Sequence, residues 1–190
     1  MTSLNWNINL ENSFFRMFQS PVESKYNIIE IGCFEGYGTL KLHKLLGSHP
    51  ESNIICIDPW DECYVKNKPE FCDIDPIFVG QYDKFLNNTK SIQHKISIKR
   101  GYSTDILKTL EENTIDFAYV DGDHSANQVY TDGSLLFPLM KKGGIILFDD
   151  YYWSHNNEVT KVGIDKFITE YKHAIDVLFI GPVQCAVKIK

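Results

Sequence analysis

The sequence of 190 residues has no long apolar run, no leader-like N-terminus and no cluster of basic residues. A membrane-spanning helix needs about 20 consecutive apolar residues, and no stretch approaches that length. The first 15 residues, MTSLNWNINLENSFF, lack the basic flank and apolar segment of a signal peptide. We therefore expect a soluble, cytoplasmic protein without a membrane partner.

Cysteine pairs are missing too, because the five cysteines form no C-x-x-C motif and no regular framework. Cys33 lies beside a glycine-rich stretch, Cys56 lies within an apolar run, and Cys185 falls in the last predicted strand. An odd number of cysteines at such positions favours reduced thiols over disulfides or zinc ligands. This agrees with a cytoplasmic protein.

Positive charge is scarce, since 19 lysines and arginines stand against 25 acidic residues, for a formal net charge of -6. Binding to a nucleic-acid backbone needs clustered lysine and arginine, so we expect no nucleic-acid partner. The remaining composition, 43% hydrophobic and 23% charged, is that of a globular protein. A chain of this length fits one domain, and we expect residues 1–190 to form it.

Short apolar runs, each ending near a glycine or an acid, alternate with amphipathic segments. Their β-branched and aromatic residues predict strands buried on both faces. The segments between them have helical spacing, as at Leu136, Leu139 and Met140. This alternation predicts an α/β fold with a mostly parallel sheet and helices on both faces. The predicted strands are residues 28–31, 54–57, 96–99, 117–120 and 145–148, followed by an antiparallel pair at 177–180 and 183–189 around Gly181-Pro182.

A glycine loop follows the first predicted strand, with the spacing G-x-x-x-G-x-G from Gly32 to Gly38. Glycines permit a tight turn and let the backbone amides approach a ligand closely. The spacing differs from the dinucleotide fingerprint and suits a nucleoside without phosphates. Asp58, at the end of the second strand, is placed to accept hydrogen bonds from ribose hydroxyls. The alternatives are a purely structural turn and a solvated or capping acid.

Four segments together resemble a class I S-adenosylmethionine-dependent methyltransferase: E-I-G-x-x-x-G-x-G-T, I-D-P-W, Y-V-D-G-D-H-S and K-K-G-G-I-I-L-F-D-D-Y-Y-W. Within that family the chain is most similar to the macrocin-type and cephalosporin-type O-methyltransferases, over residues 26 to 190. The resemblance implies a Rossmann-like, seven-stranded sheet, with methionine, ribose and adenine bound in turn along the strand ends. The cofactor-binding residues that it implies are Glu30, Gly32, Gly36, Asp58, Trp60, Tyr102, Ser103 and Asp121.

Asp121, Asp149 and Asp150 each follow the end of an apolar strand, so we expect their carboxylates to converge at one rim of the sheet. Crowded carboxylates repel one another unless a cation or protons neutralise them. Oxygen ligands suit Mg²⁺ or another hard divalent cation, Mn²⁺ or Ca²⁺. The spacing resembles that of metal-dependent O-methyltransferases, although the catechol type has asparagine at the position of Asp150. Solvated acids without a metal are the alternative.

Asp123 and His124 are the candidate catalytic bases, because both follow Asp121 closely. We favour Asp123 narrowly, on the resemblance to the macrocin type, with His124 as its rival or partner. The alternative for His124 is a residue bonded to the backbone at the start of a helix. The acceptor pocket is expected from aromatic residues at 60–78 and 151–153, which suit a flat ring or a sugar face. A second copy of the chain could supply a lid, as in a homo-oligomer.

The sequence therefore predicts transfer of a methyl group from S-adenosylmethionine to a hydroxyl oxygen of a small molecule. A bound cation would lower the pKa of that oxygen and fix its position, which favours a catechol or a vicinal sugar diol. A metal-independent methyltransferase and a catalytically silent cofactor-binding module are the alternatives.

Overall fold

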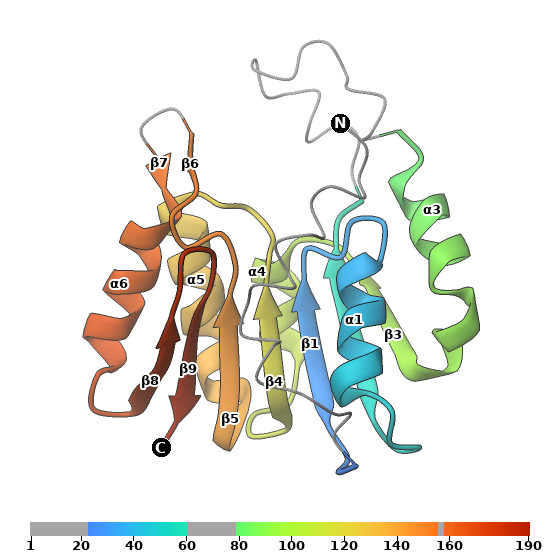
Figure 1. Ribbon diagram of the computed structural model, residues 1–190, viewed down its shortest axis with the longest axis horizontal. Helices are drawn as coiled ribbons and strands as arrows, with labels where there is room; N and C mark the ends of the chain where they lie inside the picture. The colour runs from blue at the N-terminus through green and yellow to red at the C-terminus, as the bar shows by residue number, and fades with distance from the viewer. Residues whose placement is uncertain (1–22, 61–78, 156–157) are drawn as a thin grey trace.

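The computed structural model describes residues 23–60, 79–155 and 158–190, and these build one seven-stranded sheet with helices around it (Figure 1). The strand order is β3-β2-β1-β4-β5-β9-β8, and a separate two-stranded sheet joins β6 and β7. The strands are β1 (Asn27–Ile31), β2 (Asn53–Asp58), β3 (Ile96–Arg100), β4 (Ile115–Val120), β5 (Met140–Phe148), β6 (Ser154–His155), β7 (Glu158–Val159), β8 (Ile175–Ile180) and β9 (Cys185–Ile189).

The five strands from β3 to β5 run parallel, and β9 pairs antiparallel with both β5 and β8. The predicted fold class is thus confirmed, including its C-terminal antiparallel pair. The chain order reverses between β1 and β4, where an open α/β sheet has its ligand crevice at the carboxyl ends of the strands. Figure 1 shows the arrowheads of β1, β4 and β5 at one edge of the sheet.

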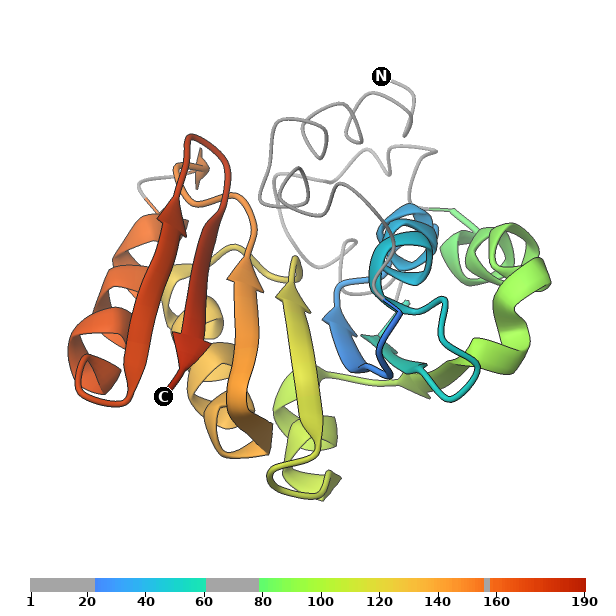
Figure 2. The same ribbon diagram turned by 60° about the horizontal axis from the view of Figure 1, so that its bottom comes forward.

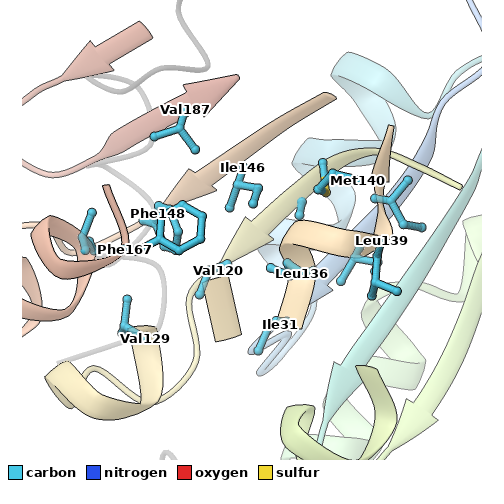
Figure 3. Packing of buried hydrophobic residues seen from close by; sticks show 14 of the residues in the cluster. Ile31, Val120, Val129, Leu136, Leu139, Met140, Ile146, Phe148, Phe167 and Val187 are labelled. Atoms are coloured by element: carbon cyan, nitrogen blue, oxygen red, sulfur yellow. The ribbon is translucent and has the colours of Figure 1, made fainter. Parts of the chain in front are cut away.

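Helices cover both faces of the sheet (Figures 1 and 2). Successive residues of a strand point to opposite faces, so Ile28 of β1 belongs to the core that includes Leu42 and Phe85, whereas Ile29 belongs to the core that includes Phe167. Figure 3 shows this second core, in which side chains of β4, β5 and β9 meet those of α5 (Ala126–Leu136). The helices are α1 (Tyr37–Leu46), α3 (Gln81–Asn88), η5 (Lys90–Lys95), α4 (Ser103–Ile106), η6 (Leu107–Thr109), α5 (Ala126–Leu136), η7 (Phe137–Leu139) and α6 (Thr160–Tyr171).

Two local predictions are wrong. Met140 does not continue the helical segment, because α5 ends at Leu136, a short 3₁₀ turn with Pro138 follows, and Met140 begins β5. The run at 96–99 is not buried on both faces, since β3 lies at the edge of the sheet and its last two residues are exposed. Among the described helices, none has the length and apolar character needed to cross a membrane.

Candidate active site

The glycine loop packs directly against the loop that follows β4. Gly32 has φ +82°, and a Cβ atom built on it would lie 2.1 Å from the carbonyl oxygen of Asp121. Gly36, with φ +87°, precedes α1, and a Cβ there would lie 2.7 Å from Cγ2 of Thr89. Both positions therefore favour glycine, because each has a left-handed backbone and a side chain would clash with the Asp121 backbone at Gly32 and with the Thr89 side chain at Gly36.

Glu30 points into the molecule between β1 and α1. It is 1% exposed, and its carboxylate accepts a hydrogen bond from the hydroxyl of Thr39. Burial raises the pKa of Glu30 to about 8, against the lowering effect of that hydrogen bond. This side chain thus joins α1 to β1 inside the fold, and its place on the methionine side of the cofactor stays a prediction.

Asp58 and Trp60 join the loop after β2 to the glycine loop. One carboxylate oxygen of Asp58 accepts the backbone N–H of Phe34 at 2.9 Å, and the other accepts that of Trp60 at 2.7 Å. The buried indole of Trp60 donates to the carbonyl oxygen of Phe34 at 2.8 Å and packs on the ring of Phe85. Burial raises the pKa of Asp58, although these backbone hydrogen bonds lower it. A carboxylate has about four acceptor positions, so Asp58 can still accept from a ribose hydroxyl.

The predicted adenine segment follows β3. Tyr102 is 45% exposed, and Ser103 begins α4 with its hydroxyl 2.6 Å from the carboxylate of Asp132 on α5. The amide nitrogen of Gln128 lies 2.9 Å from the same carboxylate oxygen. Sequence reasoning missed Gln128 and Asp132. The available signal was the phase of α5, in which Asp132 shares the buried face with Val129.

Asp121, His124 and Asp150 converge at the carboxyl ends of β4 and β5. Each offers a ligand atom, and these atoms all lie within 4.8 Å of one another. Nε2 of His124 is 3.4 Å from a carboxylate oxygen of Asp150. Two of the predicted metal ligands therefore meet, and they do so with the histidine that was predicted as a base.

Asp149, the third predicted ligand, is turned toward Tyr119. The two side chains are hydrogen-bonded, and the Tyr119 hydroxyl also lies 3.2 Å from a carboxylate oxygen of Asp121. Burial and repulsion from neighbouring acids raise the pKa of Asp121 and of Asp149, while burial alone raises that of Asp150. Such a group of acids would be stabilised by a cation, because positive charge removes both the repulsion and the cost of burial.

Asp123 and His124 occupy the turn into α5. One carboxylate oxygen of Asp123 accepts the backbone N–H of Ser125 at 2.8 Å, so this side chain helps to shape the turn. The ring of His124 lies 5.0 Å from the ring of Trp153, which is 38% exposed. Of the predicted acceptor pocket, Tyr151 is buried in the core and residues 61–78 lie outside the described residues.

A family model described as a methyltransferase domain matches residues 29–151, well over half of the chain. The chain belongs to this methyltransferase domain family. The matched segment includes the glycine loop, Asp58 and the acids after β4 and β5.

Two curated relatives and one solved structure illustrate the similarity. An uncharacterized protein of Acanthamoeba polyphaga mimivirus is 36% identical over 135 residues, which cover 65% of this chain and 50% of the viral protein. Flavonoid 3',5'-methyltransferase of Vitis vinifera is 28% identical over 152 residues, or 77% of this chain and 56% of the plant enzyme. The chain thus spans about half the length of these relatives.

The O-methyltransferase TomG of Streptomyces achromogenes, involved in tomaymycin synthesis and solved with S-adenosylmethionine, superposes with a TM-score of 0.66. The alignment covers 100% of this chain and 82% of TomG at 16% sequence identity. A likeness at that identity supports the fold alone, which is the Rossmann-like fold predicted from the sequence.

Proposed function

We propose that the protein transfers the methyl group of S-adenosylmethionine to a hydroxyl oxygen of a small molecule, with the help of a divalent cation. The observation that carries the proposal is the meeting of Asp121, His124 and Asp150 within 4.8 Å at the crevice of a methyltransferase fold. Relatives named for the methylation of flavonoids and of caffeoyl-CoA support an oxygen acceptor.

The cofactor would lie across the ends of β1 and β2. Gly32 and Gly36 let the backbone approach its methionine part, and Asp58 has the free acceptor capacity to bind the ribose hydroxyls. The adenine ring would reach the loop after β3, where Tyr102 and Ser103 lie. This order follows the crevice from the reversal point toward the edge of the sheet.

Asp121 and Asp150 would hold the cation, with Asp149 beside them. Two carboxylates fit a hard divalent ion such as Mg²⁺ or Mn²⁺, and an adjacent imidazole is compatible with the latter. When bound, the cation lowers the pKa of an acceptor oxygen and fixes its position. An acceptor with two adjacent oxygens, such as a catechol or a vicinal diol, suits this arrangement because it can chelate.

The remaining proton needs a base near the acceptor oxygen. We favour His124 over Asp123, because one oxygen of Asp123 already holds the turn into α5 while His124 faces the acid cluster. As the bond from oxygen to the methyl carbon forms and the carbon–sulfur bond breaks, His124 would take the hydroxyl proton. Trp153, against the ring of His124, offers an aromatic surface for a flat acceptor.

A second candidate function is methyl transfer without a metal. The contact between His124 and Asp150, with 3.4 Å between Nε2 and Oδ2, favours it, since a histidine that has taken the acceptor's proton would be stabilised by the neighbouring acid. Loss of activity in a chelator separates the two candidates, because only the metal-assisted enzyme would be inhibited and then restored by added Mg²⁺ or Mn²⁺.

The test begins with calorimetric titration of S-adenosylhomocysteine into the protein, with Mg²⁺ present. We expect binding that Asp58→Ala weakens strongly and that Asp83→Ala, an exposed acid on α3, leaves unchanged. Turnover is then measured with catechols and sugar diols as acceptors. A folded protein that binds no S-adenosylhomocysteine would refute the proposed function.

We also propose a reducing compartment such as the cytoplasm. The described cysteines, Cys33, Cys56 and Cys185, are all buried free thiols. Proteins of oxidising compartments usually pair their cysteines. Mass measurement of the purified protein under non-reducing conditions would show unmodified thiols.

A further inference from the structure

A buried acid lies behind the predicted adenine segment. Asp132 of α5 is 1% exposed, and one of its carboxylate oxygens is shared by the Ser103 hydroxyl at 2.6 Å and the Gln128 amide nitrogen at 2.9 Å. Ser103 and Gln128 are only half-buried, so they lie between this acid and the solvent. We call these three residues the Asp132 network. It joins α4 to α5 on one face of the sheet (Figure 1).

The carboxylate determines the direction of the hydrogens in the Asp132 network. An ionised carboxylate only accepts hydrogen bonds, so the single hydroxyl hydrogen of Ser103 must point to Asp132. For the same reason the end of the Gln128 amide that faces Asp132 must be its NH₂ group, and that group also lies 3.3 Å from Oγ of Ser103. Ser103 Oγ accepts one hydrogen bond from this NH₂ group and keeps one lone pair as an acceptor, and the carbonyl oxygen of Gln128 is an acceptor as well.

Burying the carboxylate of Asp132 costs free energy in the folded protein. The second oxygen of Asp132 has no hydrogen-bond partner among the described residues. Burial raises the pKa of Asp132 to about 6, against the lowering effect of Ser103 and Gln128, and the charge of Asp123 raises it further. At neutral pH the group is thus mostly ionised, and an ionised acid with one unpartnered oxygen is costly to bury. A purely structural contact between α4 and α5 could be made by apolar side chains at lower cost.

We propose that Asp132 is a positioning residue that holds Ser103 and Gln128 as hydrogen-bond acceptors, so that the site selects a purine with an amino group at position 6. The inference rests on the proposed function, which brings adenine to Ser103. Adenine presents a donor at position 6, whereas hypoxanthine presents a carbonyl oxygen there. Two fixed acceptors therefore form hydrogen bonds with the amino group of adenine. The carbonyl oxygen of hypoxanthine leaves the same acceptors unpaired or repels them.

The experiment compares S-adenosylhomocysteine with S-inosylhomocysteine, which carries oxygen in place of the amino group. Calorimetry measures the dissociation constant of each ligand for the wild-type protein, Asp132→Asn, Ser103→Ala and the control Asp105→Asn, an exposed acid on α4. For the wild type and the control we expect a preference of about 10-fold to 100-fold for the adenine ligand.

In Asp132→Asn the new amide can donate to Ser103, which frees the serine hydrogen to point outward. We expect the preference for the adenine ligand to fall to a few-fold, mainly because the dissociation constant of S-inosylhomocysteine decreases. Ser103→Ala should narrow the preference mainly by weakening the adenine ligand. A structural role alone would weaken both ligands equally and leave the ratio unchanged, so an unchanged ratio in both variants overturns the inference.

The failure of the proposed function would look different. A folded wild-type protein that binds neither ligand contradicts cofactor binding itself. Equal binding of both ligands by the wild type leaves cofactor binding intact and refutes the selection by the Asp132 network. If Asp132→Asn does not fold, as circular dichroism would reveal, Ser103→Ala alone still decides whether an acceptor at position 103 produces the preference.

Discussion

The acids in the two halves of the candidate site have different surroundings. In the half built by β1 and β2, both oxygens of Asp58 accept backbone N–H groups, and Trp60 closes the same loop. In the half built by β4 and β5, Asp121 and Asp150 face each other and His124 within 4.8 Å. The first half is therefore held by hydrogen bonds within the protein, whereas the second is a group of like charges that a cation would stabilise.

The largest effect is expected where the two halves touch, at Gly32. Gly32→Ala would place a methyl group 2.1 Å from the carbonyl of Asp121 and would keep a left-handed backbone. Strain and displacement together should lower the free energy of unfolding by about 3 kcal/mol. Chemical denaturation measures this.

Gly80→Ala is the matched control for this change. Gly80 has φ +66°, and a Cβ built there meets nothing within 4 Å. Gly80→Ala should lower the free energy of unfolding by about 1 kcal/mol, because it adds backbone strain without a steric clash. Equal losses in the two variants would mean that the contact between the halves is not tight.

The second prediction concerns the acid half, where Mg²⁺ or Mn²⁺ should raise the melting temperature of the wild type. At a metal concentration about 100 times the dissociation constant, the free energy of unfolding should rise by about 2.7 kcal/mol. Asp150→Asn should abolish this gain, because its carboxylate belongs to the group with Asp121 and His124. Asp149→Asn should reduce the gain less, since that carboxylate faces Tyr119.

An exposed acid supplies the control for metal binding. Asp83→Asn on α3 should retain the full metal-induced shift, as followed by scanning calorimetry with and without a chelator. If Asp149→Asn removes the shift while Asp150→Asn keeps it, the assignment of the ligands is wrong.

The third prediction concerns Glu30, a buried acid in the half built by β1 and β2. Burial raises its pKa from the usual value of about 4.5 to about 8, so the folded protein keeps a proton that the unfolded chain has lost. The contribution of this group to stability is therefore greatest at low pH and is lost as the pH rises toward 8. Between pH 6 and pH 8 the loss is about 2 kcal/mol.

Glu30→Gln does not titrate and should escape this loss. Its stability relative to the wild type should improve by about 2 kcal/mol over the same interval, measured by denaturation at each pH. Glu112→Gln, an exposed glutamate before β4, should show no such trend. A constant difference between Glu30→Gln and the wild type would show that Glu30 has an ordinary pKa in the folded protein.

The features that the sequence predicted are those with a local signal. Gly32, Asp58, Asp121 and Asp150 all stand at the ends of apolar runs, and a parallel sheet brings such ends to one edge. The direction of each side chain has no local signal. Asp149 and Asp150 are neighbours in sequence, yet one turns to Tyr119 and the other to His124.

Contacts between separate helices could not be predicted from the sequence either. Ser103 and Asp132 are 29 residues apart, and only the packing of α4 on α5 brings them together. The wrong extension of a helix through Met140 had a different origin, because Leu136, Leu139 and Met140 keep helical spacing across Pro138. A proline in such a run is the stronger signal.

The smallest predicted effect concerns the hydrogen bond between Trp60 and Phe34, in the half built by β1 and β2. Trp60→Phe keeps an aromatic ring against Phe85 but removes the indole hydrogen bond to the carbonyl of Phe34. We expect the free energy of unfolding to fall by about 1 kcal/mol, since the part-buried hydrogen bond to this carbonyl is lost. Binding of S-adenosylhomocysteine should weaken in proportion, because the same loop presents Asp58. If stability falls while cofactor affinity stays unchanged, the link supports the fold alone and does not position Asp58 for the ligand.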